Sequence, residues 1–249
     1  MSSSSRRGEY GLDGSITGVV GMSGVTAALL VAAVALARAG FVKAAAIAAL
    51  VFAVLAITLA TYLHTTRRGK FLVWADILDR LPLAGDERVL DAGCGRGAVL
   101  TMVAKRLPCG SAVGIDVWSK ADQSGNGVEA AERNLVAEGV RERCTLVTGD
   151  MRSMPFPDAS FDLIVSSLAI HNIRSGAGRC QAIAEIARAL SPGGRVAIAD
   201  LGWTRRYAQK LEALGFIGVR RRHLGWRFWW GPGFPATALV TATKPGAPT

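Results

Sequence analysis

Residues 91–98 read DAGCGRGA and carry the residue types that can hold a charged cofactor. Gly93, Gly95 and Gly97 permit a tight turn in which a ligand can touch the backbone. The apolar run RVLDAG ends in this loop and predicts a strand, and the pattern from 98 to 107 predicts a helix. The start of such a helix offers unpaired amides and a positive dipole to an anionic group.

Two carboxylates at the ends of later apolar runs extend this candidate site. Asp116 ends AVGID, and Asp150 ends CTLVTGD. A carboxylate in the place of Asp116 can accept both hydrogens of a ribose diol. The spacing Gly93-x-Gly95-x-x-Ala98 also fits the dinucleotide fingerprint, so these residues by themselves leave an NAD-dependent dehydrogenase open.

The elements that must position these residues follow from the periodicity after residue 70. Short apolar runs alternate with helical patterns, which is typical of a parallel sheet covered by helices. The predicted strands are 88–93, 112–116, 144–150, 161–168 and 195–201, and the predicted helices are 70–81, 98–107, 128–138, 178–190 and 207–214. A last pair of runs, 219–229 and 237–243, is joined by GPGFP and predicts an antiparallel hairpin.

The order of these motifs resembles that of the class I S-adenosylmethionine-dependent methyltransferases. Asp91 precedes the glycines, Gly149 and Asp150 end the third strand, FDLIVSS forms the fourth, and LSPGGRVAIAD leads into the fifth. The resemblance covers about residues 70–245. It implies an α/β fold, a Rossmann-like seven-stranded methyltransferase sheet whose final pair contains the antiparallel strand. It also implies a transferase (EC 2.1.1.-) with S-adenosyl-L-methionine as cofactor and S-adenosyl-L-homocysteine as product.

The resemblance assigns a role to each cofactor-binding position. Asp91 would hold the ammonium group, Asp116 the ribose hydroxyls, and Asp150 the adenine amino group. The other cofactor-binding residues implied by the family are Gly93, Cys94, Gly95, Gly97, Val117, Gly149, Met151, Ser167 and Leu168, and Trp118 is a further candidate from the segment that departs from the family. Gly93, Gly95 and Gly97 would line the methionine part, which Ser167 and Leu168 would face.

The adenine contacts depend on a segment in which this sequence departs from the family. Residues 117–134 make a longer connection than is usual there. Val117 and Met151 would pack on the ring, whereas Trp118 could stack on adenine, close over the substrate or pack on a surface loop. Asn126 could cap the following helix.

Methyl transfer itself mainly requires that the acceptor be aligned with the activated methyl group. A base matters for a hydroxyl or ammonium acceptor and much less for a thiol. In this family, the segment SLAIHNIRSG (167–176) lies beside the methyl group, and His171 is its only base near neutral pH. We therefore predict His171 as base or acceptor-orienting group, with packing or capping as the alternative, and Asn172 and Asp200 as further catalytic candidates.

The first quarter of the chain predicts a transmembrane helical hairpin at 16–63. The spans 16–37 and 44–63 contain no charged side chain, and each has about the 20 residues that cross a bilayer. A buried hairpin of a soluble domain would instead keep a polar face. We expect an N-terminal tail at 1–15, a juxtamembrane linker and amphipathic helix at 64–82, and the methyltransferase domain at 83–245.

The cations that flank the spans predict the topology. Their excess lies outside the short loop between the spans, so the positive-inside rule places both termini and the catalytic domain in the cytoplasm, on a bacterial inner membrane. A stripe of small residues on the first span could pack on the second span or support a homo-oligomer: Gly14, Gly18, Gly21, Gly24 and Ala28.

Charge and composition argue against two other classes of protein, those that bind nucleic acid and those that bind a metal ion. The net charge is +10, but the excess of cations lies before residue 71 and after residue 200, which suits a membrane flank and argues against nucleic acid. The three histidines and four cysteines are scattered without a zinc spacing, so no metal is predicted. The segment RRRHLGWRFWWGPGF (220–234) would face the membrane, line the substrate or pack on the sheet.

These patterns lead to a membrane-anchored methyltransferase that acts on a hydrophobic small molecule or lipid. The alternatives are a methyltransferase for a membrane-protein side chain and a cofactor-binding module without catalysis. Because every glycine and carboxylate of the predicted site lies beyond residue 76, we expect the domain to bind the cofactor without residues 1–66.

Overall fold

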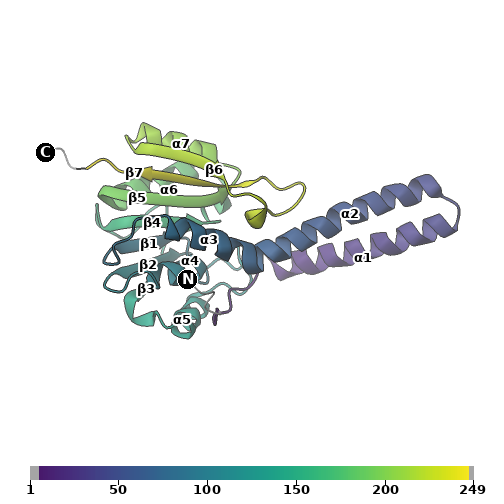
Figure 1. The fold of residues 1–249 in the computed structure, drawn as a ribbon, viewed down its shortest axis with the longest axis horizontal. Coiled ribbons are helices and arrows are strands. Elements are labelled where there is room, and N and C mark those ends of the chain that lie inside the picture. The colour runs from purple at the N-terminus through teal and green to yellow at the C-terminus, as the bar shows by residue number, and fades with distance from the viewer. Residues whose placement is uncertain (1–5, 247–249) are drawn as a thin grey trace.

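The computed structural model describes residues 6–246 and contains a seven-stranded sheet (Figure 1). The strand order is β3-β2-β1-β4-β5-β7-β6, with β1 to β5 parallel and β7 antiparallel to both of its neighbours. The strands are β1 (Arg88–Ala92), β2 (Ser111–Asp116), β3 (Cys144–Thr148), β4 (Phe161–Ser167), β5 (Leu190–Leu201), β6 (Ile217–His223) and β7 (Thr237–Thr243). The predicted Rossmann-like sheet with an antiparallel strand in its final pair is confirmed.

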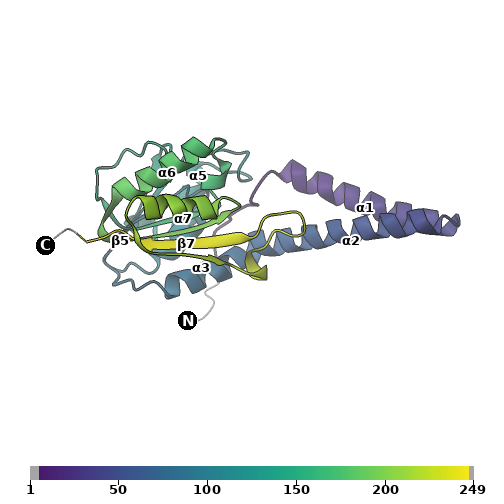
Figure 2. The same cartoon turned by 90° about the horizontal axis from the view of Figure 1, so that it is seen from above.

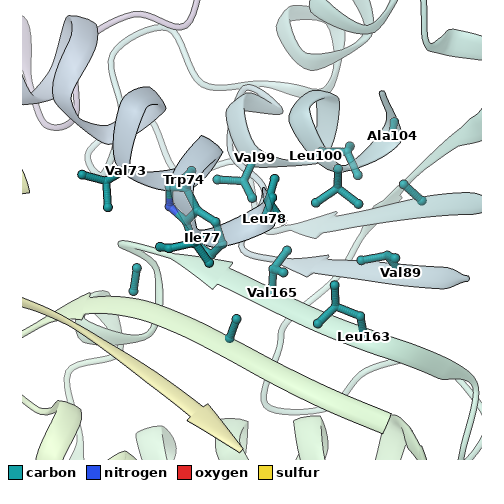
Figure 3. Close-up of a cluster of buried hydrophobic side chains, with 14 of the residues drawn as sticks. Val73, Trp74, Ile77, Leu78, Val89, Val99, Leu100, Ala104, Leu163 and Val165 are labelled. Atoms are coloured by element: carbon teal, nitrogen blue, oxygen red, sulfur yellow. The ribbon is translucent and has the colours of Figure 1, made fainter. Parts of the chain in front are cut away.

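Helices cover both faces of the sheet because alternate strand residues point to opposite sides and are apolar on each. The helices of the domain are α3 (Lys70–Asp79), α4 (Ala98–Ala104), α5 (Val128–Ala137), α6 (Gly176–Ala189) and α7 (Thr204–Ala213). Leu163 and Val165 of β4 pack towards α3 and α4, whereas Ile164 between them packs towards α6. Figure 3 shows the first cluster, in which Trp74 of α3 lies over the sheet.

Two long apolar helices, α1 (Ile16–Arg38) and α2 (Val42–His64), form an antiparallel hairpin that projects from the domain (Figures 1 and 2). Both are long and apolar enough to cross a membrane, judged by length and composition. Large apolar side chains are exposed along both helices, among them Val31 at 69% and Leu50 at 66%. The core of a soluble domain would bury such side chains, so the hairpin lacks the burial pattern of one.

The region predicted as a juxtamembrane linker and amphipathic helix, 64–82, is helical as far as Asp79. A π-helical turn, Thr65–Gly69, joins α2 to α3, so that Val42–Asp79 form one helix of 38 residues. Hairpin and domain are thereby joined by continuous backbone hydrogen bonding, without a loop between them.

The segment after β6 departs from the prediction that a strand continues to residue 229. The strand ends at His223, and a short 3₁₀ turn, Trp226–Phe228, packs on the α2–α3 helix. Thr65 donates its hydroxyl hydrogen to the carbonyl of Trp229 at 2.6 Å. A Cβ on Gly69 would lie 1.7 Å from the Arg227 carbonyl oxygen, so only glycine permits this approach. The strand therefore ends earlier than its local β pattern predicts, because the residues that follow it contact a helix more than 150 residues away in the sequence.

The small-residue stripe of α1 faces away from α2 at two positions. A Cβ on Gly21 or Gly24 would meet nothing within 4 Å. These glycines therefore do not serve the packing of α1 on α2.

Candidate active site

A cavity of about 760 Å³ lies at the carboxyl ends of the parallel strands, on the side from which the hairpin projects. β1 stands between β2 and β4 in the sheet, so the connections leave it in opposite directions and open a crevice at its end. Thirteen of the predicted site residues line the cavity: Asp91, Gly93, Cys94, Gly95, Asp116, Val117, Gly149, Asp150, Met151, Ser167, Leu168, His171 and Asn172.

Asp91 is the polar centre of the cavity floor. It is 1% exposed, and neither carboxylate oxygen has a hydrogen-bond partner among residues 6–246. Burial, together with the negative charge of Asp116, raises the pKa of Asp91 to about 8. A buried carboxyl group without a partner is costly unless a ligand satisfies it, and a cation is the natural ligand.

Asp116 at the end of β2 is pre-positioned by backbone amides. The amide of Gly95 donates to Oδ2 at 2.7 Å, and the amide of Trp118 donates to Oδ1 at 2.6 Å. Burial raises the pKa of Asp116, and these two amides partly offset the rise. Asn126 Nδ2 also donates to Oδ1, at 3.4 Å, so Oδ2 is the oxygen that retains a lone pair to which a diol hydroxyl can donate.

The far end of the cavity is formed by the residues after β3. Asp150 is paired with Arg152, whose guanidinium holds the pKa of that carboxyl below its ordinary value. Arg152 also lines the cavity. An amino group that binds Asp150 must therefore share it with Arg152 or displace the guanidinium.

Three predicted site residues do not line the cavity. Trp118 adopts a left-handed φ of 59° and donates its indole hydrogen to Thr148 Oγ1 at 2.8 Å, which directs the ring along β3. Gly97, with φ 80°, begins α4 and shapes the turn. Asp200 lies behind His171 and contacts its Nδ1, away from the cavity lining.

His171 is held by a fully buried carboxylate. Its Nδ1 lies 2.5 Å from Asp200 Oδ1, and its backbone amide donates to Oδ2 at 2.9 Å. Tyr207 donates its hydroxyl hydrogen to the same carboxylate at 3.3 Å. Burial would lower the pKa of His171, but the hydrogen bond and charge of Asp200 outweigh it, so the pKa lies above its ordinary value. Since Nδ1 faces Asp200, Nε2 is the nitrogen that can exchange a proton with a ligand.

Cys94 and Asn172 do not provide a nucleophile or base. Burial raises the pKa of the Cys94 thiol well above its ordinary value, so the thiol keeps its proton and packs beside the loop. Asn172 lies exposed at the rim, with its amide 3.5 Å from the Leu168 carbonyl oxygen. Residues 6–246 contain no group of three or more His, Cys, Asp or Glu side chains that could hold a metal ion.

Comparison with known proteins shows to which family this domain belongs. Residues 89–194 match the family described as "Methyltransferase domain". The methyltransferase GfsG of Streptomyces halstedii is 34% identical over 125 residues, which are 50% of this chain and 41% of the relative. The domain belongs to the class I S-adenosylmethionine-dependent methyltransferases.

Two further matches extend the comparison. The 27-O-demethylrifamycin SV methyltransferase of Amycolatopsis mediterranei is 32% identical over 120 residues, 48% of this chain and 40% of that protein. The chain thus spans about two fifths of these relatives. The solved structure of the [4+2]-cyclase SpnF superposes with a TM-score of 0.61 at 20% identity, covering 74% of this chain and 84% of that one, which shows a shared fold.

S-adenosylmethionine is the cofactor of this methyltransferase domain, and the residues present fit it. The unpartnered Asp91 carboxylate suits the ammonium group, and Asp116 suits the ribose diol. A Cβ on Gly93 would lie 2.2 Å from the Ala169 Cβ, so glycine is what lets the loop after β1 pack against Ala169. The bound cofactor supplies a methyl group activated by a sulfonium, and the chain supplies binding, alignment and proton transfer.

The other half of the methyltransferase cavity is formed mostly by residues that the sequence did not assign to it. Its lining includes five aromatic side chains and the ion pair of Asp13 and Lys70. The aromatic residues are Tyr62 of α2, Phe71 and Trp74 of α3, Trp230 and Phe234. The aromatic-rich segment 220–234 gave a signal for Trp230 and Phe234. For Asp13 and Tyr62 no spacing rule gave one, because they reach the cavity only through tertiary packing.

Proposed function

We propose that the protein is a membrane-anchored S-adenosylmethionine-dependent methyltransferase that methylates a hydroxyl group on a hydrophobic small molecule or lipid. The hydrogen bond between His171 and Asp200 at 2.5 Å, beside the cofactor carboxylates, carries the proposal. A buried carboxylate behind a histidine is an arrangement for proton transfer, which a hydroxyl acceptor needs.

His171 would take the hydroxyl proton at Nε2 as the acceptor oxygen approaches the methyl group. Asp200 would keep the ring oriented and stabilise the positive charge that the ring then carries. Tyr207 and the amides of His171 and Leu201 share the Asp200 carboxylate, and so hold that charge in place. Trp74, which donates to Ser167 Oγ at 2.8 Å, would form a wall that excludes water.

An apolar acceptor suits the aromatic half of the cavity and the neighbouring hairpin. Trp230 packs on Tyr62, with 5.6 Å between ring centroids, and Phe234 is 48% exposed at the rim. With the hairpin in a bacterial inner membrane and the domain on the cytoplasmic side, this rim would lie at the bilayer surface, where an apolar acceptor is concentrated.

Two readings compete with this proposal. Methylation of a membrane-protein side chain requires that a peptide enter the same cavity. The second alternative is a cofactor-binding module without methyl transfer, since the [4+2]-cyclase SpnF shares this fold and fold alone does not determine the reaction. Self-association through the glycine stripe of α1 stays a prediction.

The test uses the full-length protein in membranes of its host and S-adenosylmethionine labelled in the methyl group. The proposal expects label in a lipid-extractable molecule and its absence with an Asp116→Ala variant. Label in a protein band would support the side-chain reading, and cofactor binding without transfer would support the non-catalytic reading.

A further inference from the structure

The predicted N-terminal tail is bound along the cofactor domain over residues 7–14, which we name the N-terminal strap. Its backbone is held by side chains and loops of the domain, as four contacts illustrate. They are Gly8 N to Glu138 Oε1 at 2.9 Å, Glu9 N to Asn134 Oδ1 at 2.7 Å, Leu12 N to Ser124 Oγ at 2.7 Å and Gly14 N to Asp122 O at 2.9 Å.

The strap is also fastened to the α2–α3 helix just before α1 begins. Lys70 Nζ lies 2.8 Å from both carboxylate oxygens of Asp13, and Thr66 donates its hydroxyl hydrogen to Asp13 Oδ2 at 2.8 Å. Tyr62 donates to the Asp13 carbonyl at 2.7 Å. The strap thus links the base of the hairpin to the loops around the cofactor.

Gln123 connects the strap to the glycine loop. Its Nε2 donates to the Tyr10 carbonyl at 3.0 Å, and its Oε1 accepts from the Arg96 amide at 2.9 Å. A Cβ on Gly95 would lie 2.4 Å from Gln123 Oε1, so the two groups are in close contact. The amide of Gly95 is fixed by Asp116 and the next amide, of Arg96, by Gln123.

We propose that Gln123 is a positioning residue of the cofactor site, which transmits the position of the strap, and thereby of the hairpin, to the glycine loop. The inference uses the cofactor of the domain and does not depend on the proposed acceptor or on methyl transfer. A loop held in its binding conformation before the ligand arrives loses less conformational entropy on binding. A truncation that removes residues 1–66 also removes the strap. We therefore expect the truncated domain to bind S-adenosylmethionine weakly, which differs from the expectation drawn from the sequence alone.

The experiment compares full-length protein in detergent micelles with Gln123→Met, which keeps the length of the side chain and removes both hydrogen bonds. Gln181→Met, at an exposed position of α6, is the matched control. S-adenosylmethionine affinity is measured by calorimetry, thermal unfolding without ligand reports stability, and hydrogen exchange follows the amides of residues 93–97.

Gln123→Met should raise the Kd of S-adenosylmethionine roughly 10-fold and speed exchange at 93–97, with an unchanged Tm and no effect of Gln181→Met. Asp13→Asn, which weakens the fastening to Lys70, should raise the Kd in the same direction. An unaltered Kd in Gln123→Met would overturn the inference, and so would a Kd change that comes with a lowered Tm of the whole protein. Absence of methyl transfer with the Gln123 effect intact would instead refute the proposed function alone.

Discussion

The cavity has a cofactor half and an opposite half that the proposed function assigns to the acceptor (the acceptor half), and the two are built in different ways. The cofactor half consists of the ends of parallel strands, where Asp91 and Asp116 project from β1 and β2. The acceptor half is assembled from the strap, the hairpin base and the segment after β6, which supply Asp13, Tyr62 and Trp230. The comparison teaches that the fold fixes the donor site, while the hairpin base and the added segments shape the half that we propose for the acceptor.

Replacement of His171, which stands between the two halves, should have the largest effect. His171→Ala should slow methyl transfer by roughly 10²-fold or more and leave cofactor affinity unchanged, because the base acts only on the acceptor. In the unaltered protein the rate should rise with pH through the raised pKa of His171, since only the neutral ring accepts a proton.

The measurement is the initial rate across pH with the acceptor found by labelling, and His223→Ala, an exposed histidine of β6, is the matched control. A rate for His171→Ala equal to that of the unaltered protein at every pH would contradict the assignment of His171 as the base.

The cofactor half should show its own pH dependence through Asp91. The pKa of about 8 means that this carboxyl is protonated at lower pH, and a neutral carboxyl holds an ammonium group poorly. The Kd of S-adenosylmethionine should therefore rise by up to about tenfold for each pH unit below 8. Calorimetry in buffers of different ionisation enthalpy should detect proton release on binding. Affinity independent of pH between 6 and 8 would mean that another group holds the ammonium.

A change in the acceptor half should leave the cofactor half alone. Phe234→Ala should raise the KM for an apolar acceptor roughly 10-fold, the loss expected when one aromatic contact is removed. Phe41→Ala, at the exposed turn of the hairpin, is the control of the same residue type. A parallel loss of S-adenosylmethionine affinity in Phe234→Ala would show that the two halves are not separate.

The smallest effect is expected at Trp118. Trp118→Phe removes the indole hydrogen bond to Thr148 outside the cavity, so cofactor affinity should stay within about 3-fold. Trp203→Phe, also a partly exposed tryptophan, serves for comparison. A tenfold loss at Trp118 would place the ring on the adenine, one of the three roles that the sequence leaves open for it.

The sequence was sufficient for the parts that local patterns determine. Short continuous apolar runs mark β1 to β5, and the glycine loop and Asp116 follow them directly, so most residues that line the cofactor half of the cavity could be named. Trp118 could not be placed, because a left-handed φ after β2 turns its ring towards Thr148.

The acceptor half could not be predicted because it depends on contacts between distant segments. Asp13 and Lys70 are separated by 57 residues, and Thr65 and Trp229 by 164. The strand predicted to continue to residue 229 ends at His223 for the same reason, since the following residues pack on the α2–α3 helix. A local sequence pattern contains no information about which distant residues pack together.

Titration of S-adenosylmethionine into the full-length protein, unaltered and with Asp116→Ala, tests the central assignment most directly. The Asp116 carboxylate should contribute about 1.5–3 kcal/mol through the ribose hydroxyls, so the variant should bind roughly 10- to 150-fold more weakly. Asp86→Ala, at an exposed position before β1, should bind like the unaltered protein. Equal affinity of Asp116→Ala and the unaltered protein would contradict the assignment of this cavity to the cofactor.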